Sequence, residues 1–312
     1  MLERVYQRLM RFDVLRTAQW FYKSEPSRFT RLTQEGPACP ACAAPATHSS
    51  DYPSRKKPFS RQTVLYCTAC GLGFVPGMAE VLREFYKRDY ADSNRGDREV
   101  APAQYFEELA AGETATFAKY TNRVKRQIRL LKKNGARFGR VLDYGSGPGY
   151  FLQACGAREP HAVEPDEMSH KYLHHIGATI HDSLDSLPQA AFDTIVASHS
   201  IEHLPSEELN ATLVALLGAL APDGRLLIEV PQGGHSHLHL AGHRQDPHTL
   251  FFTGQALSWA LRLCGAEVVF QKAQGVLDSP RRKDPIYTPP PGLFYETRRG
   301  ALTLICKKKD AT

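Results

Sequence analysis

Four cysteines in two closely spaced pairs are the residues with the most specific chemistry in this sequence. Each pair forms a C-x-x-C motif, and 24 residues separate the two motifs, which are Cys39–Cys42 and Cys67–Cys70. A C-x-x-C turn directs two thiolates toward one ion, and two such turns supply the four sulfur ligands of a structural zinc site. Two disulfides or a redox pair are the alternative, which the lack of a visible secretion signal and of a thioredoxin-like context disfavours.

A second group of reactive side chains follows an apolar stretch at residues 192–198. His199, Glu202 and His203 form an H-x-x-E-H segment. Imidazole titrates near neutral pH and suits proton transfer, and together with a carboxylate it also binds divalent ions. H-x-x-E-H also occurs in zinc peptidases, but Pro205 closes this segment too early for the long helix that such a site needs. The segment therefore predicts a general base or a different kind of metal site.

Further histidines gather later in the chain. Five of the 13 histidines lie between His235 and His248. His248 is the candidate for a second base or for a further metal ligand, and the alternative is a solvent-facing loop whose histidines have no role.

A turn rich in glycine predicts a binding site for a nucleotide-like ligand. Residues 141–149, Val-Leu-Asp-Tyr-Gly-Ser-Gly-Pro-Gly, combine an apolar strand end, an acid and three alternating glycines. Glycine allows the backbone to approach a ligand closely, and the helix that is expected next offers free N–H groups. The spacing G-x-G-x-G differs from the dinucleotide motif G-x-G-x-x-G. The candidate binding residues are Asp143, Gly145, Ser146, Gly147 and Gly149.

The order of motifs between residues 136 and 312 resembles that of the class I S-adenosylmethionine (SAM) methyltransferases. The motifs are the glycine turn, a short strand that ends at Glu164, FDTIVASHSIEHLP at 192–205 and LAPDGRLLIEVP at 220–231. The resemblance implies an α/β, Rossmann-like fold with a seven-stranded, mostly parallel sheet. Helices would cover both faces, and SAM would bind at the carboxyl ends of the strands.

The resemblance also assigns residues to SAM. Glu164 lies 17 residues past Gly147, where an acid is expected to bind the ribose hydroxyls. Asp182 is expected near the adenine amino group, with Asp185 as the second choice. Ser198 ends the strand that would face the methyl group of the cofactor.

The same resemblance suggests how a methyl acceptor would be activated. His199 is the expected base, with Glu202 and His203 orienting it or sharing a metal ion with it. In ubiquinone-pathway O-methyltransferases and small-RNA 2′-O-methyltransferases this place has E-x-x-E-H and binds a divalent ion. Assistance by Mg or Mn and a purely structural role of the segment are therefore the alternatives to a metal-free base, and His248 is the next candidate.

The cysteine pairs ahead of the methyltransferase motifs carry a second resemblance. They are similar to a bacterial group in which CPxCG and CxxCGLxF precede the methyltransferase, although Ala43 stands where glycine is usual. That group includes deoxysugar C-methyltransferases and enzymes of polysaccharide and natural-product pathways. It implies O-methylation of a sugar, a glycan or another small metabolite, with sugar C-methylation as an alternative.

Two further functions are compatible with the same layout. One is an RNA methyltransferase that uses the zinc module to grip its substrate, and the other is a catalytically silent SAM-binding protein. The RNA enzyme is disfavoured because the amino-methylation motif [N/D]-P-P-[Y/F] is absent.

The chain of 312 residues suits a large domain with a smaller one attached. We predict a basic amphipathic helix at 1–33, a zinc-ribbon-like module at 34–78, a helical connector at 79–135 and the SAM domain at 136–312. The helix would pack on the SAM domain or rest on a membrane or a partner. The connector would cover the active site, and aromatic residues that could reach the cofactor pocket are Tyr86, Tyr90, Tyr105 and Phe106.

Charge and hydropathy bound the partners of the protein. The net charge is +6, and between residues 119 and 140 nine Lys/Arg occur with no Asp/Glu. This stretch predicts a solvated helix face or a surface that attracts a phosphorylated or nucleic-acid substrate. No apolar run is long enough to span a membrane, so we expect a cytoplasmic protein, with peripheral membrane contact through residues 1–33 as the alternative.

Overall fold

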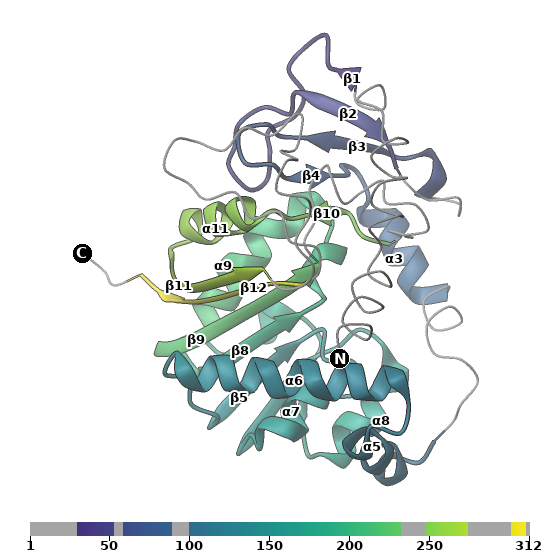
Figure 1. Ribbon diagram of the computed structural model, residues 1–312, viewed down its shortest axis with the longest axis vertical. Coiled ribbons are helices and arrows are strands. Elements are labelled where there is room, and N and C mark those ends of the chain that lie inside the picture. The colour runs from purple at the N-terminus through teal and green to yellow at the C-terminus, as the bar shows by residue number, and fades with distance from the viewer. Residues whose placement is uncertain (1–29, 53–58, 89–99, 232–246, 274–300, 310–312) are drawn as a thin grey trace, which may run out of the picture.

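The computed structural model describes residues 30–52, 59–88, 100–231, 247–273 and 301–309. Two sheets organise them, a seven-stranded sheet built from the C-terminal part of the chain and a smaller five-stranded sheet that sits on it (Figure 1). Among these residues no helix is long and apolar enough to cross a bilayer. Of the predicted helix at 1–33, only residues 30–33 are among the described residues. Tyr90 lies outside the described residues.

The large sheet confirms the expected α/β fold. Its strand order is β11-β12-β9-β8-β5-β6-β7, and the five strands from β5 to β9 run parallel, whereas β12 runs antiparallel to both of its neighbours. The chain leaves β5 toward β6 on one side and later returns to β8 on the other. Such a reversal opens a crevice at the carboxyl ends of the strands, where ligands bind in this class of sheet. The bounds are β5 Arg140–Tyr144, β6 Glu159–Val163, β7 Thr179–His181, β8 Phe192–Ser198, β9 Leu220–Pro231, β11 Ala266–Ala273 and β12 Ala301–Lys308.

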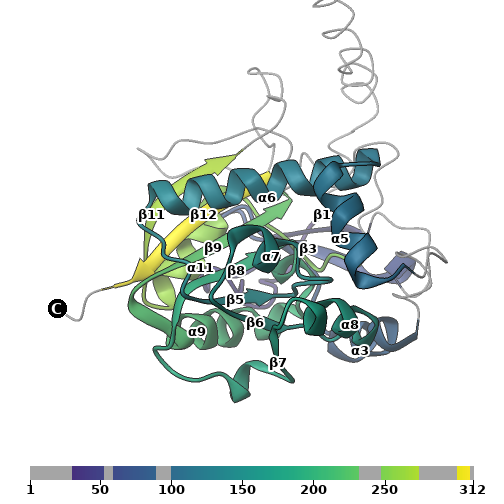
Figure 2. The same cartoon turned by 90° about the horizontal axis from the view of Figure 1, so that it is seen from below.

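Successive residues of the central strands enter two separate cores. Val141 and Leu142 of β5 are both fully buried, but Val141 packs with α6 and α7, whereas Leu142 packs with α9 and α11. The period of two in a strand explains this alternation, and burial on both faces explains the continuous apolar runs of the sequence. Figure 2 shows α6 and α9 on opposite faces of the sheet. The helices are α3 Ala79–Arg88, α5 Pro102–Ala111, α6 Ala115–Lys133, α7 Tyr150–Cys155, α8 Glu167–His175, α9 Leu209–Ala219 and α11 Gly254–Leu263.

Local sequence signals mark both ends of the long helix α6. The Thr114 side chain accepts a hydrogen bond from the N–H of Phe117 at 3.1 Å, which caps the first turn. The helix ends before Asn134 and Gly135, and Gly135 takes a left-handed conformation with φ 80°. The helix therefore stops at an Asn-Gly pair, at the end of the predicted helical connector of residues 79–135.

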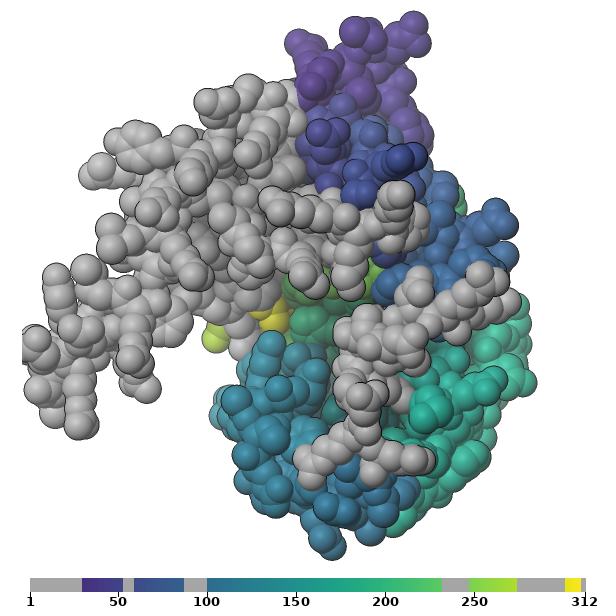
Figure 3. All heavy atoms as spheres, turned by 90° about the vertical axis from the view of Figure 1, so that its right-hand side faces the viewer, coloured from purple at the N-terminus to yellow at the C-terminus, as the bar shows by residue number. Residues whose placement is uncertain are grey.

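The small sheet combines four strands of the N-terminal part with one strand from the C-terminal part. Its order is β1-β2-β3-β4-β10, and all neighbours are antiparallel. In Figure 3 the purple and blue residues of this part lie directly on the teal and green residues of the large sheet and its helices. The bounds are β1 Thr30–Arg31, β2 His48–Asp51, β3 Thr63–Tyr66, β4 Gly73–Phe74 and β10 Leu250–Phe251, with one-turn helices η2 Phe59–Arg61, η3 Leu184–Ser186, η4 Ile201–His203 and η5 Ser206–Glu208.

Candidate functional site

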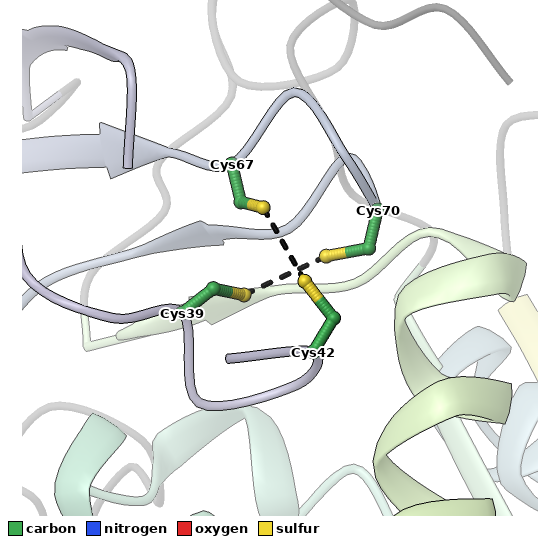
Figure 4. A group of neighbouring side chains, drawn as sticks. All are labelled: Cys39, Cys42, Cys67 and Cys70. Atoms are coloured by element: carbon green, nitrogen blue, oxygen red, sulfur yellow. Dashed lines mark hydrogen bonds between the residues drawn. The ribbon is translucent and has the colours of Figure 1, made fainter. Parts of the chain in front are cut away.

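The four cysteines of the two C-x-x-C motifs converge on one point (Figure 4). The Sγ atoms of Cys39 and Cys70 lie 3.5 Å apart, as do those of Cys42 and Cys67, and all four lie within 4.8 Å of one another. Hydrogen bonds with the neighbouring thiols raise the pKa of Cys70 and lower that of Cys67. A dication held among the four sulfurs would allow all of them to ionise.

The two cysteine turns share one backbone pattern. In the first, Cys39 donates to the carbonyl of Ala44 and accepts from the N–H of Ala43; in the second, Cys67 does the same with Leu72 and Gly71. The residue after the second cysteine is left-handed in both turns, with φ 61° at Ala43 and 79° at Gly71. Alanine tolerates this conformation less well than glycine does. The turn therefore forms although Ala43 occupies the usual glycine position.

The glycine turn leaves open space at its centre. An added Cβ at Gly145 would lie 2.7 Å from Cβ of Ser200, and one at Gly149 would lie 2.8 Å from Cδ1 of Ile176. At Gly147, with φ 52°, it would meet no heavy atom within 4 Å. Close packing therefore explains the outer glycines, whereas Gly147 faces a space that a ligand can enter.

The acids predicted for the cofactor site lie beside this turn. Glu164 at the end of β6 accepts from the N–H of Gly147 at 2.5 Å and from that of Asp166 at 2.9 Å. Asp143 is fully buried, and burial, reinforced by the charge of Glu164, raises its pKa to about 8. The Asp143 carboxyl therefore keeps its proton at neutral pH in the absence of a cationic ligand.

The remaining predicted cofactor residues lie at the same edge of the sheet. Ser146 is buried within the turn, and Asp182 is exposed directly after β7. Ser198 ends β8, and its Oγ accepts a hydrogen bond from Nε2 of Gln127 on α6 at 2.8 Å. Asp185 lies in η3, one turn past Asp182.

The structure brings together all four of the predicted catalytic residues. Oε1 of the buried Glu202 lies 3.3 Å from Nδ1 of His199 and 3.9 Å from Nε2 of His203. The ring of His248 packs edge to face on that of His203, with centroids 4.7 Å apart. Glu202, His203 and His248 each offer an atom within 4.8 Å of the others, the spacing of a metal site. Neither oxygen of Glu202 nor Nδ1 of His203 makes a hydrogen bond of ordinary geometry.

Burial sets the protonation states in this cluster. Burial alone would raise the pKa of Glu202, but the His199 hydrogen bond and the charges of His203, His199 and His248 outweigh it and hold the pKa at about 2. Burial also lowers the pKa of His203 to about 4. At neutral pH the cluster therefore holds an ionised carboxylate beside a neutral imidazole, as proton transfer and metal binding both require.

His199 occupies a conformation that few residues other than glycine adopt. Its φ is 57°, and its N–H bonds the carbonyl of Glu229 at 2.7 Å, so it continues the β8–β9 ladder while the chain turns. Such a backbone costs on the order of 1–2 kcal/mol and persists only where the surroundings impose it. The turn places the imidazole between the carboxylates of Glu202 and Glu229, the latter at 4.0 Å from Nε2.

The pair Arg126–Glu229 was not predicted from the sequence. Glu229 is completely buried, and its carboxylate accepts from Nη2 of Arg126 at 2.6 Å and from Oγ1 of Thr303 at 2.7 Å. Arg126 belongs to the basic stretch at 119–140, which we interpreted as a solvated face or an anion-attracting surface. This side chain of the stretch instead points inward, to Glu229. A glutamate inside the apolar strand LLIEVP was the signal available in the sequence.

Aromatic residues of the predicted connector contact both halves of the site. The ring of Tyr86 on α3 meets the edge of His203 at 6.3 Å. The hydroxyl of Tyr105 on α5 bonds that of Tyr150, the first residue after the glycine turn. Phe106 packs against Tyr172 of α8, and Tyr105 and Tyr150 border the same apolar cluster.

The profile of a family described as "Methyltransferase domain" matches residues 114–271, about half of the chain. Protein-L-isoaspartate O-methyltransferase of Azoarcus sp. (strain BH72) is 33% identical over 134 residues, which cover 38% of this chain and 55% of that protein. The chain thus spans about half the length of this curated relative.

Solved structures with a similar fold are SAM-dependent methyltransferases. The 1,6-didemethyltoxoflavin-N1-methyltransferase of Burkholderia thailandensis is 16% identical, with a TM-score of 0.46, over 82% of this chain and 99% of that chain. A SAM-dependent methyltransferase of Archaeoglobus fulgidus is 22% identical, with a TM-score of 0.44, over 65% and 99%. A TehB-like SAM-dependent methyltransferase of Corynebacterium glutamicum is 20% identical, with a TM-score of 0.42, over 66% and 96%.

Proposed function

Because the chain belongs to the methyltransferase-domain family and carries a SAM-dependent methyltransferase domain, we propose that it methylates a hydroxyl group of a sugar, a glycan or another small metabolite. One contact carries the proposal. Gly145 of the glycine turn packs against Ser200, the residue directly after His199, so the cofactor turn contacts the H-x-x-E-H segment. A hydroxyl needs its proton removed during transfer, and an imidazole near the methyl donor is a side chain suited to that task.

The SAM site is proposed to use the predicted residues. Glu164, already fixed by the Gly147 N–H, accepts hydrogen bonds from the ribose hydroxyls, and Asp182 binds the adenine amino group. Gly147 borders the open space that the cofactor fills. Because the sulfonium is already activated, the protein contributes mainly by aligning the acceptor oxygen behind the methyl carbon.

His199 is proposed to take the acceptor proton. As the oxygen–methyl bond forms and the sulfur–methyl bond breaks, the hydroxyl proton passes to the imidazole. Glu202, ionised and 3.3 Å from Nδ1, holds the ring and stabilises the imidazolium that results. His203 and His248 complete the acceptor side, and Tyr86 offers an aromatic face beside them.

The acceptor site also fits a divalent ion. The Glu202 oxygens and Nδ1 of His203 are buried and make no hydrogen bond of ordinary geometry, and His248 lies within reach of both residues. When bound, such an ion would polarise the acceptor hydroxyl and lower its pKa. Two imidazoles with one carboxylate favour a transition ion such as Mn over Mg, which prefers oxygen ligands.

The four-cysteine group is proposed to bind one structural zinc ion. Four thiolates within 4.8 Å fill the tetrahedral coordination and leave no position for water. Its role would be to hold the small sheet together, since two of its strands contain only two residues each besides the shared β10.

The test compares His199→Ala with His174→Ala, a change of an exposed histidine on α8. Release of S-adenosylhomocysteine (SAH) is measured with nucleotide sugars, saccharides and, because of the curated relative, peptides that contain L-isoaspartate. We expect turnover on a hydroxyl acceptor, a loss of about 10²–10⁴-fold for His199→Ala and none for His174→Ala, with unchanged SAM affinity.

Four outcomes would replace this proposal. Turnover only on peptide carboxylates, transfer to carbon, or SAM binding without turnover on any acceptor would each assign another function. The metal-assisted version holds under two conditions. EDTA must abolish the turnover of wild type and Mn must restore it, and Glu202→Ala must abolish turnover that Mn does not restore. If salt-sensitive RNA binding accompanies RNA methylation, the zinc-module RNA enzyme replaces the sugar enzyme.

A further inference from the structure

One short segment joins the four-cysteine module to the proposed acceptor site. We call residues 248–253 the bridging segment; it contains β10 and begins with His248. It lies in sequence far from the cysteines but contacts them in space, and the contacts of its two ends differ. These contacts show which parts of the molecule fix His248.

The first contacts of the bridging segment are with the H-x-x-E-H segment. The N–H of Thr249 bonds the carbonyl of Glu202 at 2.9 Å. Oγ1 of the fully buried Thr249 bonds the carbonyl of Leu204. Two hydrogen bonds of one residue thus fix the backbone of η4 directly beside His248.

The other contacts are with the cysteine module. The hydroxyl of Tyr52 donates to the carbonyl of His248 at 2.8 Å, and the N–H of Val75 donates to that of Thr249 at 2.9 Å. Strand β10 then pairs with β4. At the far end, Oγ1 of Thr253 donates to the carbonyl of Cys70 at 2.7 Å while it caps α11.

The side chains of the bridging segment alternate between two buried clusters. Phe251 packs in the core of the cysteine module, 6.2 Å from the ring of Tyr52. Leu250 and Phe252 enter the buried cluster that the large sheet, α9 and α11 share with the cysteines. A shift of the segment would therefore disturb both clusters at once, so displacing the segment costs packing free energy on both sides.

The cofactor turn is fixed independently. Gly145 bonds the carbonyl of Val163, and Glu164 bonds Gly147 and Asp166, so strands β5 and β6 and the start of α8 hold the SAM residues. These bonds involve no residue of the cysteine module. Disturbance of that module should therefore reach the acceptor side of the site and spare the SAM side.

We propose that Tyr52 is a positioning residue of the acceptor site. Its hydroxyl holds His248 against His203 and Glu202, and the metal-bound cysteine module uses this bond, β4 and Cys70 to keep the bridging segment in place. This role rests on the proposed function, because His248 is taken to belong to the acceptor site. The arrangement itself is measured without any acceptor.

The test uses Tyr52→Phe in the full-length, zinc-loaded protein. The matched control is Tyr66→Phe, because Tyr66 is an equally buried tyrosine of the same module whose hydroxyl pairs with Ser50 instead. The readout is the set of imidazole NMR signals of histidine-labelled protein at one fixed pH. The stacked pair His161–His181, on the large sheet, provides internal reference signals.

We expect Tyr52→Phe to shift the His203 and His248 signals, to leave those of His161 and His181 in place, and to keep the SAH dissociation constant within twofold. Tyr66→Phe should leave all four unchanged. Identical signals in wild type and Tyr52→Phe, or equal shifts in both variants, would overturn the proposal. A different result would overturn the proposed function, namely full turnover of His199→Ala on the true acceptor.

Metal removal gives a second test that does not depend on one hydroxyl. Zinc is chelated from the wild-type protein, and amide hydrogen exchange is followed by mass spectrometry. Peptides that cover residues 201–205 and 248–253 should exchange faster, whereas those that cover 141–149 should keep their protection. Faster exchange confined to the cysteine turns, or spread equally to the glycine turn, would contradict the proposed route.

Discussion

Single residues in unusual backbone conformations mark both proposed metal and cofactor sites, and Ala43 is the simplest to test. It is held at φ 61°, where its partner turn has Gly71. Replacing it by glycine removes a strain of about 1–2 kcal/mol, partly offset by about 0.4–1 kcal/mol of added freedom in the unfolded chain. We expect Ala43→Gly to raise the free energy of unfolding by roughly 0.5–1 kcal/mol in urea denaturation. Ala44→Gly, without positive φ, should lower it.

Gly147 tests the cofactor site at the same scale. Gly147→Ala and Gly156→Ala carry the same backbone cost, because the two glycines have φ 52° and 65° and an added Cβ meets nothing within 4 Å at either. We expect comparable losses of stability but a loss of SAM affinity of at least about tenfold, or 1.4 kcal/mol, for Gly147→Ala alone. Calorimetric titration with SAH decides the matter. Equal affinities in the two variants would remove Gly147 from the cofactor site.

At the scale of elements, α6 is tied to β9 through a buried charge. Arg126 remains 27% exposed, but its partner Glu229 has no exposure, so removing the arginine leaves a buried carboxylate without its cation. A broken buried pair costs about 3–5 kcal/mol, and partial exposure of Arg126 reduces our expectation to about 2 kcal/mol. Arg126→Ala should lose this amount in urea denaturation, whereas Lys125→Ala, an exposed neighbour, should stay within about 0.5 kcal/mol.

Strands β6 and β7 are linked by a histidine pair that should make the fold acid-sensitive. Nδ1 of His161 and Nε2 of His181 lie 3.0 Å apart, and burial, with the charges of His181 and Arg140, lowers the pKa of His161 to about 4. The unfolded chain, with a histidine pKa of about 6.5, binds the proton first as pH falls. The stability of wild type should therefore decrease from pH 6.5 to 4, and the decrease should be smaller in His161→Gln. Parallel urea midpoints of the two proteins across this range would contradict the assignment.

Local patterns predicted the elements that are proposed to hold SAM, because each depends on neighbouring residues. The apolar runs of β5 and β8 and the glycine turn between β5 and α7 are confirmed by the fold. The predicted cysteine and histidine groups also converge. The sequence could not predict Arg126–Glu229 or the pairing of β4 with β10, because 103 residues separate the first pair and a two-residue strand leaves almost no pattern.

The whole molecule should unfold as one body although it contains two sheets. The cysteines Cys39, Cys67 and Cys70 belong to the same buried cluster as α9 and α11, and Phe251 supplies the module's core from the other side of the boundary. A shared core and a shared strand couple the stability of the two parts. Calorimetry of the zinc-loaded protein should therefore show a single transition rather than two.

Zinc should stabilise that entire transition. Structural zinc contributes on the order of 10 kcal/mol, which is comparable with the full stability of a typical domain of about 5–15 kcal/mol. We expect Cys67→Ser to lower the melting temperature of the whole chain by more than about 10 °C and to release zinc. Cys264→Ser, at a half-buried cysteine outside the module, should change it by only a few degrees. If the large sheet of Cys67→Ser melts at the wild-type temperature in a separate transition, the shared strand does not couple the two parts, and the module is an independent appendage.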